Sequence, residues 1–163
     1  MSRLKDCRLI WADGVGNPDA NALYWCKIKH LWSLVGALES KEATGPSLDG
    51  VESLIWLDTL CCPASDGPGK RMAMEKIRLV YKRAKHVLVL DAGLMAYNAK
   101  DLDAAELLAR IFTSGWMRRL WTLQEGALAQ SLYFQFADES VSLPQLHAKM
   151  MTMGYNMTYR AMF

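Results

Sequence analysis

Three short apolar runs, each closed by an aspartate, constrain the fold of this chain more than any other sequence feature. They are LIWAD (9–13), LIWLD (54–58) and VLVLD (87–91). Runs of apolar residues that do not alternate with polar ones are typical of strands buried on both faces of a parallel sheet. Apolar residues at helical spacing separate the runs, at 24–38 and at 73–84. The order β-α-β-α-β therefore predicts an α/β fold with a mostly parallel central sheet.

The sequence after the third run predicts two more helices and a fourth strand. LDAAELLARIF (102–112) has a helical pattern, and Ser114 is a suitable N-cap for a further helix over 114–130. SLYFQF (131–136) is typical of a strand, and the Met-rich tail from Leu143 is expected to be helical. We expect residues 1–163 to form a single domain, because 52% of them are hydrophobic and 22% are charged.

Charge and hydropathy argue against several classes of protein. The net charge of +2 is too small to indicate a nucleic-acid partner. No apolar run approaches the roughly 18 residues that a membrane-spanning helix needs. The N-terminus carries charged residues where a signal peptide would be apolar: Arg3, Lys5, Asp6 and Arg8. We therefore expect a cytoplasmic protein with no nucleic-acid and no membrane partner.

The four cysteines have no spacing that indicates a metal or redox site. Cys7, Cys26, Cys61 and Cys62 form no CxxC pair and accompany no paired histidines, so no metal site is expected. In a reducing compartment all four are expected to be free thiols.

The aspartates that close the three runs are candidate binding residues. Right-handed crossovers bring the carboxyl ends of parallel strands to one edge of a sheet, where open α/β sheets bind ligands. Asp13, Asp58 and Asp91 are expected to lie at this edge. Each also has a structural alternative, since an aspartate after a strand often starts a turn or caps a helix.

A basic helix is predicted over residues 70–85. Seven of these residues are Lys or Arg, and only Glu75 is acidic. A solvated surface with local ion pairs explains such a helix, and binding to RNA or to an acidic partner is the alternative. The adjoining GPGKRM (67–72) lacks the spacing of a phosphate-binding loop.

Glu125 ends the otherwise core-like sequence RRLWTLQE (118–125). On a helix, Arg118, Trp121 and Glu125 would share one face. No basic residue stands three or four positions from Glu125, so no local ion pair is expected. A carboxylate beside an indole is partly withdrawn from water, which suits proton transfer or the stabilisation of a developing cation. A tertiary salt bridge is the alternative.

Four blocks of the sequence recur in the order and spacing of a known family. They are LIWADGVGNPDANAL (9–23), IWLDTLCCP (55–63), MEKIRLVYKRAKHVLVLD (74–91) and SGWMRRLWTLQEGALAQSLYFQF (114–136). On these blocks the chain resembles the fungal heterokaryon incompatibility (HET) domain over residues 8–137, with 138–163 as a C-terminal tail. The resemblance implies a role in fungal non-self recognition and programmed cell death.

HET domains are in turn similar to Toll/interleukin-1 receptor (TIR) domains. This second resemblance implies a flavodoxin-like, TIR-like three-layer domain. Several TIR domains hydrolyse NAD with a glutamate on the helix after the third strand, which implies that Glu125 is catalytic. One carboxylate can suffice, because the departing nicotinamide needs no proton and only the ribose cation must be stabilised. The residues expected to bind NAD are Trp121, Asp13, Gly14, Gly16, Asp58, Asp91 and Arg118.

Two functions from different classes follow from the resemblance. The first is an effector of cell death that cleaves NAD, which is then a substrate rather than a cofactor. The second is a non-catalytic HET module that signals by contact with other proteins, through self-association or through other incompatibility proteins.

Overall fold

A computed structural model describes residues 9–11, 22–42, 55–63 and 66–152 of the chain. The chain divides into two compact units, residues 1–76 and 77–163. Helix α3 (Pro68–Arg83) crosses the boundary between them. The expectation of a single domain stays a prediction.

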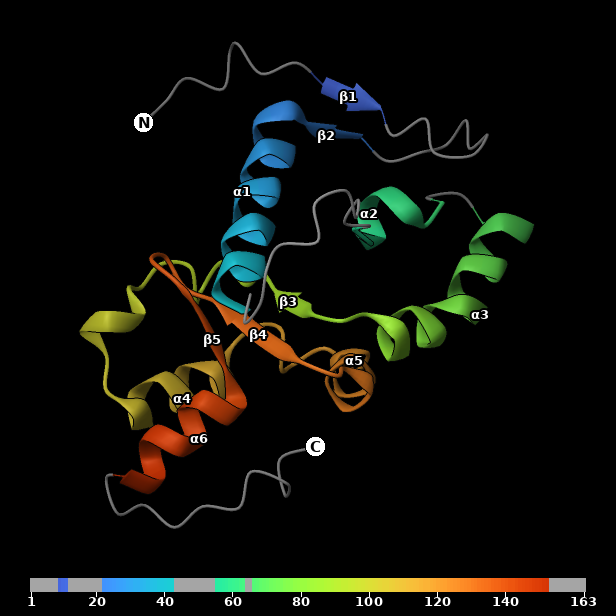
Figure 1. Ribbon diagram of the computed structural model, residues 1–163. Coiled ribbons are helices and arrows are strands. Elements are labelled where there is room, and N and C mark those ends of the chain that lie inside the picture. Colours follow the sequence, from blue (N-terminus) through green and yellow to red (C-terminus); the bar gives the residue numbers. More distant parts are fainter. Residues whose placement is uncertain (1–8, 12–21, 43–54, 64–65, 153–163) are drawn as a thin grey trace. The chain divides into compact units, whose positions relative to one another are not determined.

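In the first unit, two short antiparallel strands precede a long helix. β1 (Leu9–Trp11) pairs with β2 (Ala22–Tyr24), and α1 (Trp25–Glu42) follows directly (Figure 1). Only residues 12–21 separate the two strands, whereas a parallel pair needs a crossover of about a dozen residues or more. The first apolar run therefore contains a strand as predicted, but the strand is antiparallel to its neighbour.

The second apolar run forms no strand in its described part. Residues 55–57 have no strand partner among the described residues, and Asp58 begins the short helix α2 (Asp58–Cys61). The Asp58 carboxylate accepts a hydrogen bond from Trp56 Nε1 at 2.7 Å. A negative side chain is favoured in the first turn of a helix. The strand predicted to end at Asp58 is therefore wrong, because this aspartate starts a helix.

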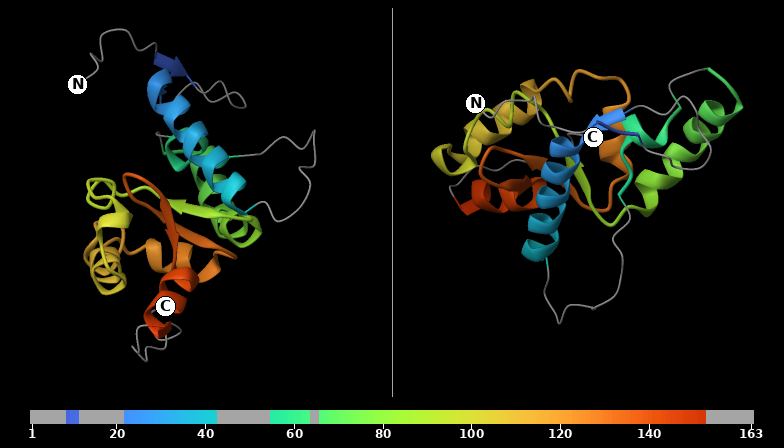
Figure 2. Two further views of the ribbon diagram at one scale, coloured as in Figure 1. Left: turned by 60° about the vertical axis from the view of Figure 1, so that its left-hand side comes forward. Right: turned by 90° about the horizontal axis from the view of Figure 1, so that it is seen from above.

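The second unit contains a three-stranded sheet. β3 (Val87–Val89) pairs in parallel with β4 (Leu132–Gln135), and β4 pairs antiparallel with β5 (Ser140–Ser142). The connection from β3 to β4 contains η2 (Ala99–Asp101), α4 (Ala104–Thr113) and α5 (Thr122–Leu128), and α6 (Leu143–Thr152) follows β5. Figure 2 shows this sheet from two further sides.

The core of this unit is one hydrophobic cluster shared by the sheet, α4 and α6. Helices α4 and α6 lie side by side (Figure 1). All four residues of β4 are buried, and Phe134 at its centre is fully enclosed. Ile111 of α4 and Leu146 of α6 belong to the same cluster. The strand and helices predicted here are confirmed, and their apolar faces form the core.

The fold is a mixed α/β arrangement with small sheets, so the predicted flavodoxin-like, TIR-like three-layer domain with a mostly parallel sheet is wrong. Among the described strands, β3 and β4 form the one parallel pair. Residues 136–139 alone join β4 to β5, and so short a connection allows only a hairpin. Two of the three apolar runs marked strands, but connection length decided how the strands pair.

The helix predicted over 114–130 forms only in its second half. Residues 115–120 lie in turns, Trp121 stands directly before α5, and α5 begins at Thr122. Ser114 ends α4 instead of starting the next helix, and its buried side chain accepts a long hydrogen bond from the Met117 N–H at 3.4 Å. The next N–H, that of Trp116, donates to the side chain of Asp91. This long-range bond holds residues 115–120 in a turn rather than a helix.

Candidate functional site

Asp91 joins the end of β3 to the turn that precedes α5. Its Oδ1 accepts hydrogen bonds from the N–H groups of Gly93 at 2.8 Å and Leu94 at 3.3 Å. Its Oδ2 accepts a hydrogen bond from the Trp116 N–H at 2.9 Å. A Cβ atom at Gly115 would lie only 3.1 Å from Asp91 Oδ2, so a glycine permits this close approach. Asp91 therefore fixes two segments of backbone, as its structural alternative predicted.

Trp116 links Asp91 to Glu125 through two hydrogen bonds. Its indole is buried and meets the Phe134 ring edge to face, with centroids 5.5 Å apart. The indole Nε1 donates a hydrogen bond to Glu125 Oε2 at 3.1 Å. Asp91, Trp116 and Glu125 therefore form a continuous chain of contacts from the sheet to α5. We call these three residues the anchor cluster.

The indole beside Glu125 belongs to a different tryptophan from the one predicted. Helical spacing predicted Trp121 next to the carboxylate, because the two would share a helical face. Trp121 instead stands directly before α5 and is 57% exposed. Trp116 was overlooked, although it lies in the same sequence block. Its side chain reaches Glu125 only because residues 115–120 turn back.

Glu125 is half-buried and meets no cation among the described residues. The salt-bridge alternative is therefore absent from the described part of the chain. The predicted closeness of a carboxylate and an indole is present, with Trp116 as the partner. A carboxylate held by a neutral donor keeps its full charge for a further ligand.

The turn before α5 exposes four consecutive side chains. Arg118, Arg119, Leu120 and Trp121 are all exposed, and Leu120 is 82% accessible. Neither arginine forms an ion pair within the described ranges. The predicted shared face of Arg118 and Glu125 is wrong, because Arg118 lies in the turn and not on the helix. We call residues 118–121 the exposed turn.

The remaining predicted substrate contacts lie outside the described residues or in two different units. Asp13, Gly14 and Gly16 lie outside the described residues. Asp58 belongs to the unit 1–76 and Asp91 to the unit 77–163. A common cleft for the three aspartates therefore stays a prediction.

One of the described cysteines differs from expectation. Cys26 is disulfide-bonded, so the expectation of four free thiols is wrong there. Cys61 and Cys62 are free thiols, and Cys7 lies outside the described residues. Partial burial is the largest influence that raises the pKa of the Cys62 thiol, followed by the charge of Asp58. The Cys62 thiolate, the reactive form of this side chain, is therefore disfavoured.

No group of three or more His, Cys, Asp or Glu residues in the described part of the chain is arranged to hold a metal ion. No helix there is both long enough and apolar enough to span a bilayer.

Comparison with known proteins yields no relative for this chain. No protein-family model, no curated protein and no solved structure matches it. The resemblance to HET domains therefore rests on the quoted sequence blocks alone.

Proposed function

We propose that this chain is a HET-type signalling module of fungal non-self recognition and programmed cell death that acts by protein contact through the exposed turn. The observation that carries this proposal is the exposure of Leu120 and Trp121 on a backbone anchored by Asp91. Tryptophan and arginine are the residues most enriched at binding hot spots. A turn already held in one conformation loses little entropy when a partner binds.

The partner that we propose is a second copy of this chain. Arg118 and Arg119 supply two unpaired positive charges within the described residues. The same unit exposes Asp101 and Asp103, which meet no cation in the described ranges. The arginines of one copy can therefore face the carboxylates of the next, in a head-to-tail contact with the apolar pair at its centre.

Sedimentation velocity over a range of protein concentrations tests this contact. We expect the wild type to self-associate, and the Leu120→Ser, Trp121→Ser double variant to stay monomeric. Arg118→Glu with Arg119→Glu should also be monomeric, and mixing it with Asp101→Lys should restore hetero-association. Met151→Ser is the matched control, because it also removes an exposed large apolar side chain, in this case from α6. A wild type that stays monomeric throughout would overturn the proposed contact.

NAD cleavage by Glu125 is the second candidate function. One observation favours it: the half-buried carboxylate is oriented by the Trp116 indole and meets no cation among the described residues. Such a carboxylate can stabilise the ribose cation that forms as nicotinamide leaves. Asp91 acts in this proposal as a positioning residue, because both of its oxygens are occupied by backbone N–H groups.

Release of nicotinamide from NAD by the purified protein tests this second function. Glu125→Gln keeps an oxygen that can accept the Trp116 hydrogen bond but removes the charge. We therefore expect the variant to lose NAD cleavage and to keep the thermal midpoint of the wild type. Equal cleavage by both proteins would show that Glu125 is not the catalyst. No cleavage by the wild type would leave the contact module as the proposed function.

We place the protein in the cytoplasm, as the resemblance to HET domains implies. A reducing compartment disfavours disulfides, so Cys26 is expected to be reduced inside the cell. Acid quenching of cells, followed by alkylation and mass measurement of the protein, tests this placement. A Cys26 that resists alkylation after quenching would contradict it.

A further inference from the structure

Helix α3 buries none of its sixteen residues. Its half-buried residues lie on one side at helical spacing and include Ala73, Ile77 and Val80. The rest of its circumference is exposed. The helix therefore presents a long, continuous face to its surroundings.

This face concentrates the positive charge of the chain. Residues 68–85 hold seven of the 19 Lys and Arg residues but only one of the 17 Asp and Glu residues. Lys70 pairs with Asp66 at 2.7 Å. The other six cations have no ion pair within the described residues: Arg71, Lys76, Arg78, Lys82, Arg83 and Lys85. Because the whole chain has a net charge of only +2, the remainder of the sequence is net acidic and the charge is strongly segregated.

Three apolar side chains are exposed among these cations: Met72 at 52%, Met74 at 47% and Leu79 at 44%. Met72 and Leu79 are seven residues apart, so they share one stripe of the helix. Lys76 and Arg83 lie along the same stripe, and Arg78 adjoins it. A ligand that matches this stripe must offer negative charge to the unpaired cations and apolar surface to the exposed methionine and leucine.

We infer that the exposed face of α3 binds the surface of a membrane that contains anionic phospholipids. Anionic headgroups attract the lysines and arginines, while the acyl boundary takes up the apolar side chains. Lysine and arginine stems can lie along that boundary and keep their charges in water. The expectation of no membrane partner rested on the lack of a spanning run, and surface binding needs no such run.

Two other ligands fit this face less well. A nucleic acid would engage the cations but would leave Met72 and Leu79 without apolar partners. A protein groove that takes up an amphipathic helix engages mainly the apolar face of that helix, whereas the face of α3 that carries Ile77 and Val80 is already half-buried. A flat anionic surface needs only the face that α3 presents.

Vesicle flotation with the full chain tests the inference. We expect binding to phosphatidylcholine vesicles that contain about one third phosphatidylserine, with none to pure phosphatidylcholine and with weakening as salt rises. Arg78→Gln with Lys82→Gln should weaken binding at least tenfold. Met72→Gln with Leu79→Gln should weaken it by a similar factor. Lys149→Gln with Met151→Gln is the matched control on α6 and should bind as the wild type does.

All of the substituted side chains are exposed, so the variants are expected to fold, and circular dichroism checks this. Failure of the wild type to bind phosphatidylserine vesicles would overturn the inference. Binding that is unaffected by the Met72 and Leu79 substitutions would also overturn it, since only charge would then matter. A single-stranded RNA that displaces the protein from vesicles and binds the apolar double variant undiminished would assign the face to nucleic acid instead.

Discussion

Helices α4 and α3 both have an apolar face in the sequence, yet only α4 enters a core. α4 buries four of its ten residues and α3 buries none of its sixteen. The buried residues of α4 are Ala104, Leu107, Leu108 and Ile111. The half-buried face of α3 includes Ala73, Ile77 and Val80, with cations on either side. Helical periodicity therefore marks a face, but the amount of apolar surface and the neighbouring charge decide how deeply that face is buried.

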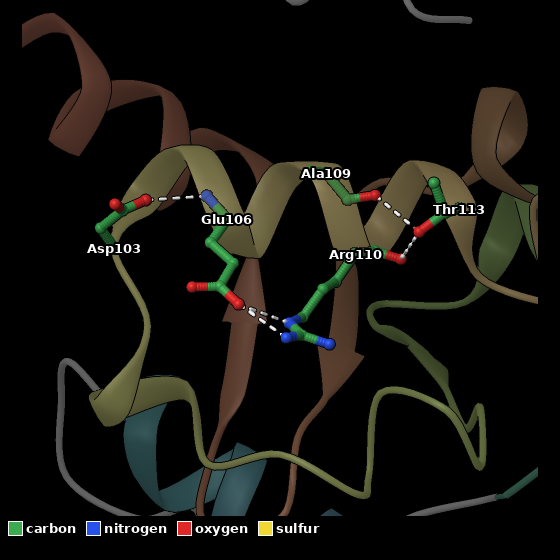
Figure 3. Close-up of polar contacts among 5 residues, drawn as sticks. All are labelled: Asp103, Glu106, Ala109, Arg110 and Thr113. Carbon is green, nitrogen blue, oxygen red and sulfur yellow. Dashed lines mark hydrogen bonds and ion pairs between the residues drawn. The ribbon is translucent and has the colours of Figure 1, made fainter.

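The two helices also differ in how their ends are held. Asp103 caps α4 by accepting a hydrogen bond from the Glu106 N–H at 2.8 Å, and Glu106 pairs with Arg110 at 2.6 Å (Figure 3). At the other end, the Thr113 hydroxyl donates to the carbonyl of Ala109 at 2.9 Å (Figure 3). α3 has no acidic residue in its first turn. The nearby Asp66 binds the Lys70 side chain instead of the backbone. The start of α4 is therefore fixed by a contact to its own backbone, and the start of α3 by a side-chain pair in water.

The largest difference is expected between two isoleucines. Ile111→Ala on α4 should lower the free energy of unfolding by about 2–5 kcal/mol, because it leaves a cavity in the core. Ile77→Ala on α3 removes the same atoms from a half-buried site and should cost about 1 kcal/mol or less. Urea unfolding of both variants measures the two losses. Equal losses would break the comparison and would show that α3 is packed as deeply as α4.

A smaller difference is expected at the helix starts. Asp103→Ala removes the N-cap of α4 and should cost about 1 kcal/mol. Asp66→Ala removes an exposed ion pair with Lys70, and it should lower stability much less than Asp103→Ala because water screens the pair. Thermal unfolding of the two variants gives the result directly. If Asp66→Ala lowers the midpoint as far as Asp103→Ala does, the start of α3 is held more firmly than its exposure indicates.

The smallest difference is expected in acid, between Asp138 and Asp66. The Asp138 side chain is 19% exposed. Burial, the largest single influence, raises its pKa. Hydrogen bonds from the N–H groups of Ala99, Asp138 itself and Lys100, together with the Lys100 charge, lower this pKa further than burial raises it. The pKa of the exposed Asp66 is lowered mainly by its hydrogen bond from Lys70. Each carboxylate therefore stabilises the fold above the ordinary carboxyl pKa, and this contribution is lost as pH falls through the lowered pKa.

Thermal midpoints measured from neutral pH into the acid range separate the two groups. Asp138→Asn should make the loss of stability on acidification shallower, because the amide does not titrate. Asp66→Asn should change the curve less, since an exposed pair in water is screened. Added salt should therefore erase the Asp66 effect before the Asp138 effect. The reverse order would contradict the assignment of Asp138 as the anchored carboxylate.

Local pattern was enough to predict four elements of the second unit, but not β5. The runs 87–91 and 131–136 contain the strands β3 and β4, and the apolar spacing around Leu107 and the tail from Leu143 mark the helices α4 and α6. The dense positive charge of residues 70–85 predicted a solvated helix, which α3 is. These features depend on neighbours within a few residues, so one sequence suffices to predict them.

Tertiary structure decided strand partners and the neighbours of Glu125. The short connection from β4 to β5 makes their pairing antiparallel. Apolar runs alone therefore do not show whether the strands of a sheet are parallel. Asp91 binds the Trp116 N–H across 25 residues of sequence and holds the turn before α5. Trp116, and not Trp121, therefore meets Glu125. Helical spacing assumes an unbroken helix, and only a contact between distant residues could show that this helix begins at Thr122.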